Sequence, residues 1–213
     1  MDVNFWHNKW QNNQIAFHRS NPNPLLVAHF DALSLTKANT IFIPLCGKTL
    51  DIAWLLSKGY RVVGAELVES AIEQLFAELA MTPKVTVIGE IKHYSAQNID
   101  IYVGDIFDIT QTLLGPVDAI YDRAALVTLP NEIRPQYYAH LMNITQQAPQ
   151  LLIAYHYDQQ LVQGPPFSIS NQEVSQHYQK HYTLTLIESV DVEGGMKGQC
   201  EATENVWLLS TIS

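Results

Sequence analysis

Residues 41–56 read IFIPLCGKTLDIAWLL, and this stretch decides the fold class. Its first residues, together with Thr40 before them, form the segment Thr40–Pro44, which is rich in β-branched and aromatic residues. Such a composition is typical of a buried strand. A turn around Gly47 follows, and Leu50–Ser57 is then apolar almost all round, as expected of a helix buried against a sheet. A strand, a tight turn and a helix in this order predict a β–α unit with a ligand at the end of the strand.

The same alternation continues along the chain. It predicts further strands at residues 61–66, 99–103, 117–121 and 151–157, and helices from residue 70, around residues 131–147 and at residues 170–180. Residues 84–98 read as an inserted hairpin. Strands at residues 182–190 and 205–211 have no helix between them, which predicts an antiparallel pair. The whole pattern indicates an α/β fold with an open, doubly wound and mostly parallel sheet.

Two helix starts carry a capping-box pattern, in which a serine is followed three residues later by a glutamate. The pairs are Ser70 with Glu73 and Ser170 with Glu173. Each pair predicts a helix whose serine hydroxyl accepts a hydrogen bond from the glutamate N–H.

The length of 213 residues suits one well-buried domain, so residues 1–213 are interpreted as a single domain. Within it, residues 1–36 are expected to form an N-terminal lid. This segment contains Trp6, Trp10 and Phe17, which are costly to leave in water and should fold back onto the body. Residues 25–33 read as a short amphipathic helix.

The composition excludes several classes of partner. The formal net charge of −9 argues against nucleic acid, because phosphate binding needs concentrated Lys and Arg. Two cysteines, Cys46 and Cys200, form no disulfide framework and no metal-binding spacing, so we expect a cytoplasmic location and no metal. No apolar run is long enough for a bilayer, so no membrane partner is expected. A monomer that binds a small molecule is the prediction.

The turn after the first strand has one glycine where nucleotide-binding turns have two or three. Phe42 stands where a phosphate-binding loop needs its first glycine, and the dinucleotide pattern is also absent. Gly47 therefore either allows close approach of a ligand without a pyrophosphate, or serves turn geometry alone.

Glu66 ends the second strand, about twenty positions after the turn, where an acidic residue grips ribose hydroxyls. The alternative is a carboxylate at the strand end that caps the next helix. A ribose acceptor beside a turn that lacks phosphate-binding glycines indicates a nucleoside. S-adenosylmethionine is the common nucleoside cofactor of this architecture.

Later strand ends supply further candidates. Asp105 is placed to accept from an adenine amino group with Ile106 packing on the ring, or else it makes a local turn. Arg123 needs a carboxylate partner, either that of the cofactor or an internal one from Asp122 or Glu66. The aromatic rings of the lid either belong to the core or lie against a sulfonium cation.

Several segments together resemble the thiopurine S-methyltransferase family, in its short bacterial form, over nearly the whole chain. The matching segments, in the family's order, are WHNKWQNNQIAFH (Trp6–His18), IPLCGKTLDIAWLLSKGYRVVGAEL (Ile43–Leu67), DIFDI (Asp105–Ile109), YDRAALVTL (Tyr121–Leu129) and GPPFSIS (Gly164–Ser170). The Pro-Leu-Cys-Gly-Lys and Asp-Arg-Ala segments are more specific than a generic methyltransferase glycine.

The resemblance implies a class I, Rossmann-like, seven-stranded fold and S-adenosylmethionine as methyl donor to aromatic or heterocyclic thiols. Bacterial relatives are also associated with selenium and tellurium compounds and their detoxification. By position, the resemblance implies an acceptor contact at Phe17 and cofactor contacts at Trp10, Leu45, Glu66 and Arg123, with Trp6, Asp105 and Ile106 nearby. Together with Gly47 of the turn, these residues make up the predicted cofactor site. Animal members carry an arginine near the acceptor in the segment that corresponds to Val192–Gly198. Here that segment contains Lys197 and no arginine.

The expected reaction is a direct attack of the thiol sulfur on the methyl carbon, which needs alignment and exclusion of water but no protein nucleophile. Arg123 is then expected to polarise the acceptor or to bind the cofactor, and Cys46 to be a packing residue. Two alternatives stay open, a methyltransferase with another acceptor and a cofactor-binding module without catalysis. An NAD-dependent dehydrogenase is opposed by the missing glycines.

Overall fold

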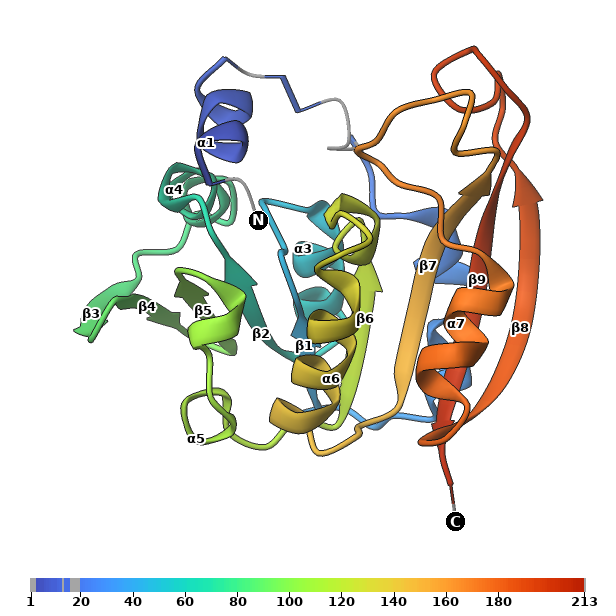
Figure 1. The fold of residues 1–213 in the computed structure, drawn as a ribbon. Coiled ribbons are helices and arrows are strands. Elements are labelled where there is room, and N and C mark those ends of the chain that lie inside the picture. Colours follow the sequence, from blue (N-terminus) through green and yellow to red (C-terminus); the bar gives the residue numbers. More distant parts are fainter. Residues whose placement is uncertain (1–2, 13, 16–19, 213) are drawn as a thin grey trace.

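One nine-stranded sheet organises the chain in the computed structural model, which describes residues 3–12, 14–15 and 20–212 (Figure 1). The strand order is β3-β4-β5-β2-β1-β6-β7-β9-β8. In chain order the strands are β1 (Thr40–Ile43), β2 (Arg61–Glu66), β3 (Lys84–Ile88), β4 (Ile91–Ala96), β5 (Ile99–Val103), β6 (Ala119–Arg123), β7 (Gln150–Tyr157), β8 (Tyr182–Asp191) and β9 (Ala202–Thr211).

The centre of the sheet is parallel, as the alternation of strands and helices predicts. Strands β5, β2, β1, β6 and β7 run parallel, and β9 lies antiparallel between β7 and β8. These are the seven strands that were expected. The predicted hairpin forms β3 and β4 and pairs with β5, so it extends the sheet to nine strands.

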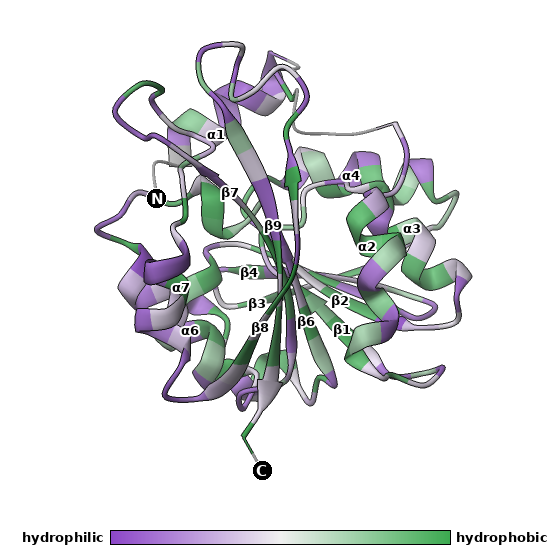
Figure 2. Ribbon diagram, turned by 90° about the vertical axis from the view of Figure 1, so that its right-hand side faces the viewer, coloured by the Kyte–Doolittle hydropathy of each residue, from purple (hydrophilic) through white to green (hydrophobic). Residues whose placement is uncertain are grey.

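Helices cover both faces of the sheet (Figure 2). One face carries α2 (Pro24–His29), α3 (Leu50–Ser57) and α4 (Glu69–Glu78), and the other carries α5 (Gln111–Leu114), α6 (Arg134–Ile144) and α7 (Asn171–Tyr178). Strand β1 shows why both faces are filled. Ile41 and Ile43 point into the core under α2–α4, whereas Phe42 points into the core under α6 and α7. Single 3-10 turns complete the fold as η1 (Phe30–Leu33), η2 (Ile106–Asp108) and η3 (Leu126–Thr128).

The expected lid segment, residues 1–36, divides into two parts. Helix α1 (Val3–Gln11) was not predicted, because the stretch is polar and has no wide apolar face. Its signal was the spacing of Trp6 and Trp10, which lie four residues apart and therefore share a helix face. Helix α2 and η1 pack into the core instead, where Leu26 and Phe30 are buried.

The two predicted capping boxes have different outcomes. The first is wrong, because α4 begins at Glu69 and its N-cap residue is Val68, which makes no side-chain cap bond. The second is half confirmed, since the Ser170 hydroxyl accepts from the N–H of Glu173 at 3.1 Å. The Glu173 carboxylate turns away from the cap and binds Arg134.

Among the described residues, no helix combines the length and the apolar character that crossing a bilayer requires.

Candidate active site

A cavity of about 560 Å³ opens at the carboxyl ends of the parallel strands. Of the segments that border it, α1 lies at the upper left of Figure 1, and the loops that precede α7 and join β8 to β9 lie at the upper right. Among the described residues, its walls come from seven parts of the chain. These are α1 with Gln14, the turn at residues 45–49, the end of β2, the turn at residues 123–128, Tyr155 of β7, and two loops, with residues 164–166 and 192–197.

The turn after β1 is held in place by the carboxylate at the end of β2. Glu66 Oε2 accepts the N–H of Gly47 at 2.8 Å, and its Oε1 accepts the N–H of Val68 at 2.8 Å. One buried side chain thus ties together the two turns that border the cavity. This satisfies two backbone donors that would otherwise be unpaired in a buried place.

Gly47 is needed for its conformation and for its neighbour. Its φ is +53°, a region that favours glycine, and a Cβ there would lie 3.2 Å from the ring of Trp10. Trp10 is itself buried, so the end of α1 sits directly over the turn.

Besides Lys197 in the loop between β8 and β9, two non-glycine residues on the described cavity wall adopt the left-handed conformation. Leu45 has φ +45° and Ala124 has φ +61°, and both border the cavity. Such residues cost on the order of 1 kcal/mol each and cluster at functional sites. Their position at the ends of β1 and β6 therefore points to the cavity as the site of function.

Of the two roles considered for Glu66 from the sequence, the contact at the start of the next helix is present, whereas the contact with a ribose stays a prediction. Glu66 also faces the cavity. Burial raises the pKa of its carboxyl, and the backbone N–H groups of Val68, Gly47 and Leu67 partly oppose that rise. Each carboxylate oxygen has two lone pairs, so an oxygen that already binds one N–H can accept another donor.

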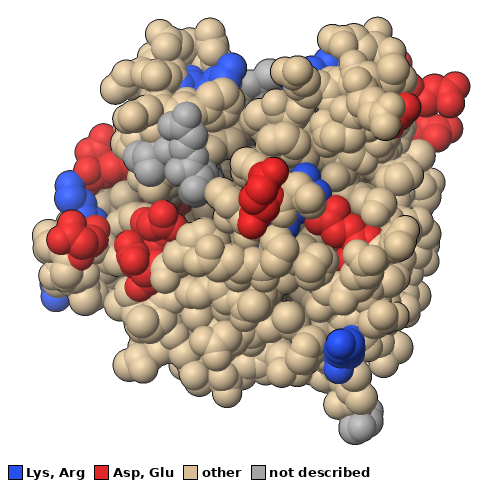
Figure 3. Space-filling model, viewed as in Figure 1, with Lys and Arg blue, Asp and Glu red and all other residues tan. Residues whose placement is uncertain are grey.

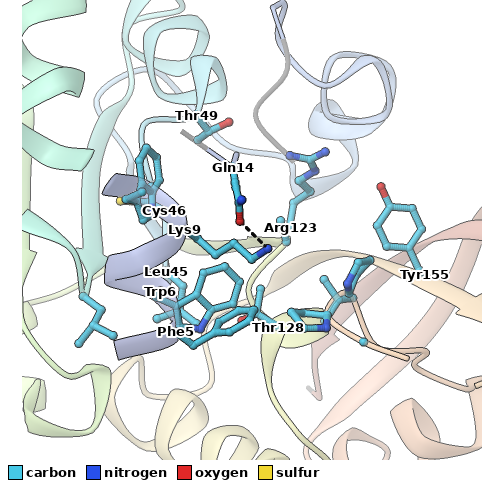
Figure 4. Close-up of a pocket in the computed structure, with 18 of the residues that line it drawn as sticks. Phe5, Trp6, Lys9, Gln14, Leu45, Cys46, Thr49, Arg123, Thr128 and Tyr155 are labelled. Atoms are coloured by element: carbon cyan, nitrogen blue, oxygen red, sulfur yellow. Dashed lines mark hydrogen bonds between the residues drawn. The ribbon is translucent and has the colours of Figure 1, made fainter. Parts of the chain in front are cut away.

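The turn after β6 is held by a second buried carboxylate. Asp122 Oδ1 accepts the N–H of Leu126 at 3.1 Å, and Oδ2 accepts the hydroxyl of Tyr137 at 2.7 Å. Burial raises the pKa of Asp122 to about 6, against the effect of these hydrogen bonds. Asp122 thereby fixes the turn from which Arg123 borders the cavity (Figure 4).

The structure brings most of the candidate residues to the cavity. Trp6, Trp10, Leu45, Gly47, Glu66 and Arg123 all border it. Asp105 and Ile106 do not. Asp105 Oδ1 accepts the N–H of Phe107 at 3.0 Å, which is the local turn named as its alternative, and the Ile106 side chain is fully buried in the core. Their contact with adenine stays a prediction, and Phe17 lies outside the described residues.

Several cavity residues were not found from the sequence. From α1 these are Phe5 and Lys9, and from later segments Val127, Thr128, Tyr155, Pro165, Pro166 and Met196. Lys9 follows Phe5 by four residues, and its ammonium group lies 5.4 Å from the centre of that ring. Lys197, the basic residue of the segment 192–198, also borders the cavity.

An internal ion pair anchors the loop that carries Pro165 and Pro166. Arg134 Nη1 donates to the Glu173 carboxylate at 2.8 and 3.0 Å and to the carbonyl of Ser168 at 3.3 Å. The N–H of Phe167 donates to the carbonyl of Val127 at 2.6 Å. This loop is therefore joined to α6, to α7 and to the turn after β6.

Cys46 is buried beside the cavity, and its Sγ packs against Gly64. A Cβ added to Gly64 would lie 2.9 Å from this Sγ. Burial, and secondarily the charge of Glu66, raise the pKa of its thiol well above the ordinary value. A thiol that stays protonated is a poor nucleophile. Among the described residues, no three His, Cys, Asp or Glu side chains form a group that could hold a metal ion.

Comparison with known protein families gives a match over almost the whole chain. A family model described as thiopurine S-methyltransferase matches residues 1–211. The chain is 51% identical over 210 residues to a thiopurine S-methyltransferase of Xanthobacter autotrophicus, covering 98% of this chain and 99% of the relative. It is 48% identical to that of Teredinibacter turnerae, covering 99% and 98%.

Solved structures share the fold at low sequence identity. A 1,6-didemethyltoxoflavin-N1-methyltransferase of Burkholderia thailandensis has a TM-score of 0.67 at 12% identity, covering 99% of this chain and 87% of that one. A TehB-like SAM-dependent methyltransferase of Corynebacterium glutamicum has a TM-score of 0.57 at 12% identity, covering 99% and 98%. These matches confirm the class I methyltransferase fold that the sequence predicts. The chain belongs to the thiopurine S-methyltransferase family and is an S-adenosylmethionine-dependent methyltransferase.

Proposed function

We propose that the chain methylates the sulfur of aromatic and heterocyclic thiols, with selenium and tellurium compounds as further acceptors in detoxification. The observation that carries this proposal is the turn at Gly47. The Glu66 carboxylate accepts the N–H of Gly47, and the ring of Trp10 packs against Gly47. The turn presents its backbone, Trp10 of α1 presents an aromatic ring beside it, and the turn contains no phosphate-binding pattern. The names of the relatives from Xanthobacter and Teredinibacter support a thiol acceptor.

The residues of the cavity fit S-adenosylmethionine. Glu66 has carboxylate oxygens at the end of β2, where a ribose is held in this architecture, and Arg123 supplies a cation for an amino-acid carboxylate. The rings of Trp6 and Trp10 are suited to lie against a sulfonium ion. When bound, this cofactor supplies an electrophilic methyl group on a positively charged sulfur.

We assign the acceptor to a part of the cavity that comes from different segments. Val127, Pro165, Pro166 and Met196 supply apolar surface, and Thr128 and Tyr155 supply hydroxyl groups. An aromatic ring placed there is oriented by contact on its faces, and water is displaced from the sulfur. The free-energy cost of removing a thiolate from water is lower when a cation is near, and Arg123 provides that cation.

The protein supplies no nucleophile in this proposal. Cys46 stays protonated because its pKa is raised, and its side chain packs against β2. Heterocyclic thiols are partly ionised near neutral pH, so the acceptor brings its own reactive form. The contribution of the chain is alignment, a local positive charge and a cavity that excludes water.

The test uses methyl-labelled S-adenosylmethionine with 6-mercaptopurine. We expect label in the S-methyl product with the unchanged chain and a loss of about ten-fold or more in kcat/KM with Arg123→Ala. Arg61→Ala is the matched control, since Arg61 is an exposed arginine at the opposite, amino-terminal end of β2. Equal rates for the two variants would contradict the role of Arg123. Tight binding of S-adenosylhomocysteine without transfer to any thiol would favour a binding module.

A further inference from the structure

The charge of the cavity is opposite to that of the chain. Among the described residues, four basic side chains border it, those of Lys9, Lys48, Arg123 and Lys197, with one acidic side chain, that of Glu66. The chain as a whole has a formal net charge of −9. A basic cavity in an acidic protein concentrates positive potential at one place, and this attracts anions.

Two of these charges have partners that account for them. Lys48 forms an ion pair with Glu78 at 2.6 Å, outside the cavity. Arg123 is assigned to the cofactor carboxylate or to the thiolate in the function proposed above. Lys9 and Lys197 have neither kind of role there.

The ammonium groups of Lys9 and Lys197 contact neutral oxygens. Lys9 Nζ donates to the side-chain oxygen of Gln14 at 3.1 Å, and Lys197 Nζ donates to the carbonyl of Gln163 at 2.8 Å. These contacts hold the two side chains in place but do not neutralise their charges. Each ammonium group has three N–H donors, and each contact uses one of them.

The two lysines belong to opposite walls. Lys9 projects from α1 into the cavity toward the side of Arg123 and Tyr155 (Figure 4), and Lys197 belongs to the turn between β8 and β9. Figure 3 shows basic atoms on both sides of the hollow at the top of the molecule. A ligand that enters between these walls passes between two cations before it reaches the end of β6.

We propose that Lys9 and Lys197 form a subsite for a second anionic group of the acceptor, so that the preferred acceptors are aromatic thiols that carry a carboxylate. This inference rests on the proposed function, because it concerns the outer end of the same acceptor. The cofactor adds a sulfonium cation to a cavity that is already basic, which increases the cost of leaving it without an anion. A thiolate compensates one charge, and a ring carboxylate compensates a second at the rim.

The test measures binding separately from transfer. The probes are para-(methylthio)benzoate and its methyl ester, titrated calorimetrically into the protein saturated with S-adenosylhomocysteine. They have the same ring and sulfur and differ in charge. We expect the carboxylate to bind about ten-fold more tightly than the ester, and this ratio to decrease as salt is raised, because partly exposed charges are screened.

Substitution of the two lysines locates the effect. Lys9→Gln and Lys197→Gln should each lower the ratio of the two affinities by about three-fold. Lys84→Gln on the exposed edge strand β3 is the matched control and should leave the ratio unchanged. Equal affinity for the carboxylate and the ester, or a ratio that the two lysine variants do not change, would overturn the subsite.

Transfer to para-mercaptobenzoate and to its methyl ester then separates the two proposals. Transfer to both thiols at equal kcat/KM would leave the proposed function standing and overturn the subsite. Absence of transfer to either thiol, together with carboxylate-selective binding that the lysine variants abolish, would overturn the proposed function and leave the subsite standing.

Discussion

Replacing Arg134 tests how the wall of the cavity is held in place. The Arg134 side chain is 5% exposed and that of its partner Glu173 is 16% exposed, so their ion pair is largely removed from water. Arg134 Nε also donates to the carbonyl of Leu129 at 2.9 Å, and the guanidinium lies 5.5 Å from the ring centre of Phe167. Arg134→Met keeps much of the side-chain volume and removes every one of these polar contacts.

The expected loss of stability follows from the contacts that Glu173 keeps and loses. Without Arg134, the Glu173 carboxylate keeps the Tyr138 hydroxyl at 3.0 Å as a partner but loses its counter-charge. Removing one partner of a buried pair costs about 3–5 kcal/mol, which corresponds to a decrease in Tm of roughly 10 °C for a domain of this size. Glu173→Gln in the same chain removes the stranded charge, so the double variant should recover about 2 kcal/mol relative to the sum of the single variants.

Urea unfolding at fixed pH measures this cycle, with the slope of the transition checked for constancy. Acceptor kinetics give a second measurement. Because the anchored loop carries Pro165 and Pro166 to the cavity, Arg134→Met should raise KM for the thiol more than it raises Kd for S-adenosylhomocysteine. A loss below about 1 kcal/mol, or strictly additive single effects, would refute the reasoning.

Substitutions at three further residues test other parts of the site. Burial raises the pKa of Asp122 from 3.8 to about 6, so the folded chain keeps this proton to a higher pH than the unfolded chain. The free energy of unfolding therefore decreases as pH rises through this range, and Asp122→Asn should remove up to about 3 kcal/mol of that decrease. Urea unfolding between about pH 4 and pH 7 measures it. The same dependence of the unfolding free energy on pH in both proteins would exclude the shift. Cys46→Ala should keep most of the transfer activity and cost about 1 kcal/mol of stability for the lost packing of Sγ, whereas loss of transfer with intact cofactor binding would make Cys46 part of the chemistry. Glu66→Ala leaves the N–H groups of Gly47 and Val68 without their acceptor and should cost about 2–6 kcal/mol of stability. Glu66→Gln keeps one oxygen and should cost less. Equal thermal stability of the two variants would contradict the conclusion that Glu66 holds the two turns together.

The sequence predicted the fold well because the core strands carry strong patterns. Strand β5 and helix α3 have the predicted bounds, and β2 ends at Glu66 as expected. Strand β6 begins two residues later than predicted, at Ala119, so Asp122 and Arg123 are its last residues. The start of α4 was misplaced because a serine near a helix start resembles a cap, while the actual stabilising contact comes from Glu66, which precedes the helix.

The site was predicted in part, for a physical reason. Residues at strand ends are placed by the parallel sheet, so Glu66 and Arg123 could be located from strand bounds alone, whereas Leu45 was implied by the family resemblance. Lys9, Tyr155 and Pro166 reach the cavity through tertiary contacts of α1, of β7 and of a long loop, and local periodicity contains no information about these contacts. Ile106 shows the opposite case, since its contact with adenine was inferred from its place near a strand end and stays a prediction, while its side chain is buried in the core.

Transfer to a matched set of acceptors tests the central claim most directly. Thiophenol, phenol and aniline share one ring and differ in the reacting atom, so they can compete in a single reaction with methyl-labelled S-adenosylmethionine. The proposed function predicts that the label appears in the S-methyl product, with kcat/KM for thiophenol at least about a hundred-fold above that for the other two acceptors. Label on the oxygen or nitrogen acceptor at a comparable rate, or binding of S-adenosylhomocysteine with no transfer to thiophenol, would contradict it.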